Sequence, residues 1–181
     1  MKITKENSVL LVIDIQSKLL PFINNNEELE KRCLKLIQGI QILNIPIIIT
    51  EQYPKGIGLT IESIIKQLGE DYKPIEKFHF SCCGSAEFMN KLYEFNKPNV
   101  IVIGIETHVC VLQTALDLLR LNYNVYVVED CVSSRNPNDK NVAIERIRQE
   151  GGLITTYESI LFEICQISGT QEFKEISKIV K

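Results

Sequence analysis

The chain has 181 residues, of which 45% are hydrophobic, and its formal net charge is −3 at pH 7. This length predicts a single domain over residues 1–181 with a sizeable core, and the weakly acidic charge argues against electrostatic binding to nucleic acid. No apolar run approaches the length of a membrane span, so we expect no transmembrane helix.

The amino-terminal segment, residues 1–7, carries neither the apolar core of a signal peptide nor an arginine-rich presequence. We therefore expect a cytoplasmic protein, with a mitochondrial location as the alternative.

The six cysteines contain no C-x-x-C pair, and the two histidines lie far apart in the sequence. This pattern predicts reduced thiols without a disulfide framework, and we expect neither a zinc site nor another cofactor.

The first predicted strand is the apolar run Val9–Ile13, which suits a central strand buried on both faces. Asp14 follows it directly, and it either belongs to a turn or holds its carboxylate in a cleft at the sheet edge. Taken alone, these two interpretations are balanced. Apolar residues at helical spacing then predict a helix over Glu27–Leu43, and a second buried strand is expected over Ile45–Thr50.

Proline and glycine mark the segment Glu51–Gly58 as a loop, in which we expect Glu51 and Gln52 to be solvated polar residues. The segment Lys73–Ser81 alternates weakly between apolar and polar residues, as expected of a short strand near the sheet edge. Lys77 lies within it. A lysine at such a place is ordinarily a solvated surface residue.

The apolar run Val100–Ile103 predicts a buried parallel strand that ends at Gly104. From about Thr107 to Leu119 the apolar residues recur at helical spacing. Cys110 therefore lies at the start of a helix just beyond a strand end, where open α/β sheets place their chemistry. A helix N-terminus also favours a thiolate. The alternative is a small buried cysteine that fills space under the helix.

A fifth strand is predicted over Val125–Val128, ending at polar residues, and a short sixth strand over Leu153–Thr156. Helices follow over Glu158–Cys165 and Glu172–Val180. Strands that alternate with helices predict a six-stranded parallel sheet with helices on both faces. The fold class is therefore a three-layer α/β/α, Rossmann-like architecture.

Asp14, Lys77 and Cys110 each fall at or just beyond the end of a predicted strand. In a doubly wound sheet these ends converge on one rim. A cation stabilises a thiolate nucleophile, and a carboxylate can take the thiol proton and return it to a leaving group. The three residues are therefore chemically sufficient for acyl transfer by a cysteine.

Three stretches resemble the isochorismatase-like cysteine hydrolase family, and in particular the eukaryotic isochorismatase domain-containing proteins: Leu10–Gln16, Glu76–Ser81 and Gly104–Ala115. The resemblance implies the strand order 3-2-1-4-5-6. It also implies a small-molecule substrate and a homodimer or a higher homo-oligomer.

The same resemblance implies that Asp14 is the general base and acid, Lys77 the positioning cation and Cys110 the nucleophile. It implies a cis peptide bond before Glu106 and an oxyanion hole made by the backbone N–H groups of Glu106 and Cys110. The Glu106 side chain is then expected to be solvated. Candidates for lining the substrate pocket, each with a structural role as the alternative, are Gln16, Phe80, Ile105 and His108.

The chain departs from nicotinamidases of this family, which carry an Asp-x-His pair and further histidines that bind a metal after the second strand. Here that region is Glu51-Gln52-Tyr53, so we expect neither a metal nor a nicotinamide substrate. The sequence predicts a cysteine-dependent hydrolase of a small amide, carbamoyl or ester substrate. The alternative is a catalytically weak binding or regulatory protein on the same fold.

Overall fold

The computed structural model describes residues 2–181, and Met1 of the amino-terminal segment lies outside the described residues. Six strands form one sheet in the order β3-β2-β1-β4-β5-β6. Every neighbouring pair is parallel, which confirms the predicted topology. The strands are β1 (Ser8–Ile13), β2 (Ile47–Gln52), β3 (Ile75–Lys77), β4 (Asn99–Ile105), β5 (Asn124–Ser133) and β6 (Leu153–Thr155).

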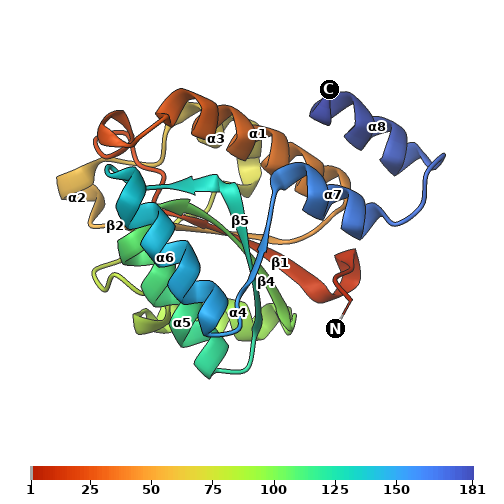
Figure 1. Cartoon of the computed structure of the whole chain (residues 1–181). Coiled ribbons are helices and arrows are strands. Elements are labelled where there is room, and N and C mark those ends of the chain that lie inside the picture. Colours follow the sequence, from red (N-terminus) through yellow and green to blue (C-terminus); the bar gives the residue numbers. More distant parts are fainter. Residues whose placement is uncertain (1) are drawn as a thin grey trace.

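Helices cover both faces of the sheet (Figure 1). On one side lie α1 (Asn26–Ile42), α3 (Glu62–Leu68) and α7 (Tyr157–Cys165), with α8 (Gln171–Val180) packed against α1 and α7. On the other side lie α4 (Ala86–Phe95), α5 (Leu112–Arg120) and α6 (Pro137–Gln149). Along residues 2–181, no helix combines the length and the apolar character needed to cross a membrane.

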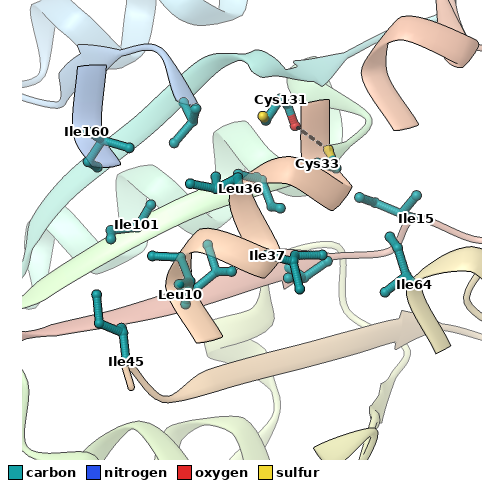
Figure 2. Close-up of a cluster of buried hydrophobic side chains, with 14 of the residues drawn as sticks. Leu10, Ile15, Cys33, Leu36, Ile37, Ile45, Ile64, Ile101, Cys131 and Ile160 are labelled. Carbon is teal, nitrogen blue, oxygen red and sulfur yellow. Dashed lines mark hydrogen bonds between the residues drawn. The ribbon is translucent and has the colours of Figure 1, made fainter. Parts of the chain in front are cut away.

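The apolar residues of β1 alternate between two separate clusters, one on each face of the sheet. Leu10 contributes to the cluster beneath α1 and α7, whereas Val9 and Leu11 contribute to the cluster on the α5 side. Figure 2 shows Leu10 of β1 and Ile37 of α1 together in the first cluster. Both faces of the central strand are therefore buried, as an uninterrupted apolar run requires.

Two strands extend beyond their predicted ends. β2 continues to Gln52 because Glu51 and Gln52 pair with β3, so the expectation that both residues lie in a solvated loop is wrong. β5 continues through the polar residues at its middle to Ser133, since its pairing with β4 shifts register and then resumes at Gly104 and Ile105. The sequence analysis ends each strand at its first polar residues, and it therefore misses the extensions of β2 and β5.

Gly104 brings the carboxyl ends of β1 and β4 together. It lies in register with Ile13 and has a φ of +128°, which an L side chain rarely adopts. A Cβ at this position would also overlap the Ile13 carbonyl oxygen. Because glycine fits here, β1 and β4 stay paired up to Ile13 and Gly104, and Asp14 after β1 and Glu106 after β4 lie at the same rim of the sheet.

The chain enters its central helix through a π-helical turn, Thr107–Val111, which continues directly into α5. The Glu106 carbonyl accepts hydrogen bonds from the N–H groups of Val109 at 3.1 Å and Val111 at 3.3 Å. Cys110 lies within this turn, so the thiol is at the start of a helix as the sequence predicts.

Candidate active site

Asp14 and Lys77 form a buried ion pair at the carboxyl rim of the sheet. The Lys77 Nζ lies 2.6 Å from Asp14 Oδ2, and both side chains are at most 1% exposed. The second carboxylate oxygen, Oδ1, accepts a hydrogen bond from the Thr50 hydroxyl at 2.8 Å. Both oxygens of Asp14 therefore have a protein donor, which fixes the carboxylate and offsets the cost of burying it.

The Lys77 ammonium has three further acceptors, all of them neutral. These are the Gln52 side-chain oxygen at 2.9 Å and the carbonyls of His79 at 3.2 Å and Phe80 at 3.1 Å. Burial is the largest single influence on the pKa of Lys77 and lowers it, but the charge and hydrogen bond of Asp14, together with Cys82 and Cys110, outweigh burial, and the net direction is upward. The residue is a buried cation, and the interpretation as a solvated surface lysine is wrong.

Cys110 lies beside this ion pair and is only 6% exposed. Asp14 and Lys77 both lie close enough to the thiol to shift its pKa. Burial and the charge of Asp14 together raise the pKa of the Cys110 thiol well above its ordinary range, and Lys77 opposes them only in part. Lys77 favours the thiolate, as expected, but burial and Asp14 outweigh it, so the group is a protonated thiol at neutral pH.

Glu106 precedes Cys110 at the mouth of the same turn. The peptide bond between Ile105 and Glu106 is cis. The Glu106 side chain is buried, and its Oε2 accepts hydrogen bonds from the Arg135 backbone N–H at 3.0 Å and from the guanidinium Nε at 3.1 Å. The expectation of a solvated side chain is wrong, because the loop after β5 brings a cation against it.

The residues proposed to line the pocket differ in what they contact. The Gln16 amide is fully buried and forms hydrogen bonds with main-chain groups of Gln52 and Gly58. These contacts favour a structural role for Gln16, which is the alternative to lining the substrate pocket. Ile105 is also fully buried, whereas Phe80 is 54% exposed. His108 contacts Ser134, with its Nδ1 2.9 Å from the hydroxyl oxygen.

Two polar residues of the rim, Glu51 and Gln52, are bonded within the protein, whereas the sequence predicts solvated loop residues. Gln52 contacts Lys77, as described above. Glu51 is 1% exposed, and its Oε1 accepts hydrogen bonds from the Thr60 N–H, the Thr60 hydroxyl and the Tyr72 hydroxyl at 2.6–2.7 Å. The signal that could have found them is their place directly after a buried strand, which also marks Asp14.

Exposed aromatic side chains surround the carboxyl ends of β2 and β3. The rings of Tyr53 and Phe78 lie 5.8 Å apart, and both side chains are about half exposed or more, as is that of Phe80. These three aromatic side chains give this part of the rim an exposed apolar surface. Within residues 2–181, no group of three or more His, Cys, Asp or Glu side chains is arranged to hold a metal ion.

Comparisons with known proteins agree on one family and one fold. A model of the isochorismatase domain matches residues 8–159. Isochorismatase family protein 1B from Dictyostelium discoideum is 41% identical over 99% of this chain and 89% of its own length. Isochorismatase domain-containing protein 2 from Danio rerio is 38% identical over 99% of this chain and 89% of its own length.

Two solved structures superpose closely. The structure described as the MAR1 ribonuclease from Caenorhabditis elegans has a TM-score of 0.93 and 40% sequence identity, and the match covers 99% of this chain and 92% of that one. YcaC from Pseudomonas aeruginosa, solved with covalent acrylamide, has a TM-score of 0.92. At 21% identity over 98% of this chain and 91% of that one, YcaC shows the fold alone.

Proposed function

This chain belongs to the isochorismatase family, and from that premise we propose that it cleaves a small amide, carbamoyl or ester substrate through an acyl-enzyme on Cys110. Family membership supports hydrolase activity in general. The observation that carries the finer proposal is the buried Asp14–Lys77 ion pair beside the Cys110 thiol. A nucleophile, a proton acceptor and a cation held at one site are what acyl transfer by cysteine requires.

In the first step, Cys110 Sγ attacks the substrate carbonyl carbon while the thiol proton passes to Asp14. Transfer during the attack fits this site, since the resting sulfur is a thiol that lies near the carboxylate. The carbonyl oxygen becomes an oxyanion. The backbone N–H groups of Glu106 and Cys110 are the donors that we assign to it.

In the second step, Asp14 returns the proton to the leaving nitrogen or oxygen, the bond from the carbonyl carbon to that atom breaks, and the acyl group stays on Cys110. A water molecule then attacks the acyl carbon as Asp14 takes one of its protons. The thiolate leaves with the electron pair of the carbon–sulfur bond and regains its proton from Asp14. Lys77 stays protonated and compensates the negative charge that moves between carboxylate and sulfur.

We also propose that the chain acts as a homo-oligomer on a small-molecule substrate. YcaC from Escherichia coli, which is 22% identical with a TM-score of 0.88, is described as an octameric hydrolase of unknown specificity. The octamer is a property of that protein. For this chain, light scattering at micromolar concentration is the direct measurement, and a monomer would contradict the proposal.

A screen of small amides, carbamoyl compounds and esters tests the proposed reaction, with Cys110→Ala as the control. We expect turnover by the wild type and none by the variant, which keeps a small side chain at the same buried position. RNA belongs in the screen because the Caenorhabditis elegans relative is described as a ribonuclease. With a net charge of −3, we expect no RNA cleavage by this chain.

The second candidate is a binding or regulatory protein with little turnover. The observation in its favour is the closed site, since Asp14 is fully buried and the Cys110 thiol is held in its protonated form. Saturable binding of a compound from the screen without any product would favour this candidate over the hydrolase.

A further inference from the structure

Gln52 is held in one orientation at the end of β2. Its side-chain Oε1 accepts a hydrogen bond from the Lys77 ammonium at 2.9 Å, and its Nε2 donates to the Phe78 carbonyl at 2.8 Å. Turning the amide over would place its NH₂ group against the ammonium and its oxygen against the carbonyl. The oxygen and the nitrogen of the amide therefore each have a hydrogen-bond partner, and this fixes the orientation in which the oxygen faces Lys77.

The backbone of Gln52 is fixed as well. Its N–H donates to the Gln16 side-chain oxygen at 2.8 Å, and its carbonyl accepts from the Gln16 side-chain nitrogen at 3.0 Å. Gln16 is fully buried and lies two residues after Asp14 in the chain, so its bonds to Gln52 tie the end of β2 to the segment that follows β1. The two glutamines thus connect the strand that carries Asp14 to the amide that holds Lys77.

The chemistry of the four acceptors around Lys77 matters for its charge. Asp14 is the single charged acceptor, while Gln52 and the carbonyls of His79 and Phe80 are neutral. The three N–H groups of an ammonium are fully occupied by such a set. Neutral acceptors fix the position of the ammonium without cancelling its charge. Asp14 already balances this charge, and a second carboxylate in place of Gln52 would leave the group with a net negative charge beside the sulfur.

We infer that Gln52 is a positioning residue, which fixes the Lys77 ammonium between Asp14 and Cys110 and, by being uncharged, leaves the lysine charge to act on the sulfur. This inference rests on the proposed function. Gln16 contributes indirectly, because its amide holds the backbone of Gln52 in place.

The pH dependence of Cys110 alkylation by iodoacetamide tests the inference. The titratable groups that act on Lys77 are Asp14, Cys82 and Cys110, and peptide mapping separates the alkylation of Cys110 from that of other cysteines. For Gln52→Glu we expect alkylation of Cys110 at pH 8 to slow by about tenfold, with the pH profile moved upward by about one unit. Gln38→Glu adds the same charge on the exposed face of α1 and should leave rate and profile unchanged.

Gln52→Met keeps the test informative if the glutamate variant does not fold. It removes the acceptor without adding charge, so alkylation should slow by less than in Gln52→Glu, and the profile should move less. Wild-type rates and profiles in both folded variants would overturn the inference. The proposed function is tested separately by turnover of the wild type, so a failure of one is distinguishable from a failure of the other.

Discussion

Lys77 reaches across β2 to Asp14, which lies at the end of a strand that is not its neighbour. The two residues are separated by 63 positions in the chain, and β2 lies between their strands in the sheet. Their charged atoms nevertheless meet at 2.6 Å with almost no solvent exposure. The pair is therefore a feature of the tertiary fold, and each partner depends on the other.

Lys77→Met should lower the free energy of unfolding by about 3–5 kcal/mol, because the variant leaves the Asp14 carboxylate buried without its cation. Urea denaturation at pH 7 measures this loss. Lys66→Met is the control, since Lys66 pairs with Glu62 at the surface, where both side chains are more than 70% exposed. Removing that pair should change the free energy by less than about 1 kcal/mol. Equal stability of Lys77→Met and the wild type would contradict the account.

Asp14→Asn should lower turnover by about 10²- to 10⁴-fold, because an amide can neither take the thiol proton nor return it to the leaving group. Binding of a substrate found by the screen should change less, since the size of the side chain is conserved. Steady-state kinetics together with equilibrium binding separates the two effects. An asparagine variant that turns over substrate at the wild-type rate would rule out Asp14 as the proton carrier.

Thr107→Val should raise the free energy of unfolding by about 1 kcal/mol. The Thr107 hydroxyl is the one buried side-chain polar atom in residues 2–181 that has no hydrogen-bond partner. Valine keeps the shape and removes the unpaired group. Thr114→Val is the matched control, because the Thr114 hydroxyl accepts the Cys82 N–H at 2.9 Å. That variant should be less stable than the wild type, and a stabilised Thr114→Val would contradict the explanation.

Alkaline pH should destabilise the fold through Cys82. Burial raises the pKa of this thiol to about 12 from an ordinary value of 9.0. The folded state therefore holds the proton more tightly than the unfolded state. The resulting stabilisation is complete below pH 9 and is lost as the pH rises towards 12. Urea denaturation between pH 7 and about 11 should show a shallower decline for Cys82→Ala than for the wild type. Cys165→Ala, at a partly exposed position, should keep the wild-type slope.

The positions of Asp14, Lys77 and Cys110 were predictable because Lys77 ends a strand and the other two lie beyond strand ends, and parallel strands end at one rim. The environment of Gln52 was not, since proline and glycine after it favour a loop and its partner Lys77 lies 25 residues away. The Glu106 side chain was misplaced for a similar reason, as Arg135 reaches it from the loop after β5. The protonation of Cys110 depends on burial and on two opposing charges, whose balance requires distances that a sequence does not contain.

The mass of the intact protein during turnover tests the acyl-enzyme most directly. After rapid acid quenching of wild-type protein with a substrate from the screen, we predict an adduct that equals the acyl group and maps to the peptide containing Cys110. Cys110→Ala should show neither adduct nor turnover. Turnover that persists in Cys110→Ala, or an adduct on another residue, would contradict covalent hydrolysis through Cys110.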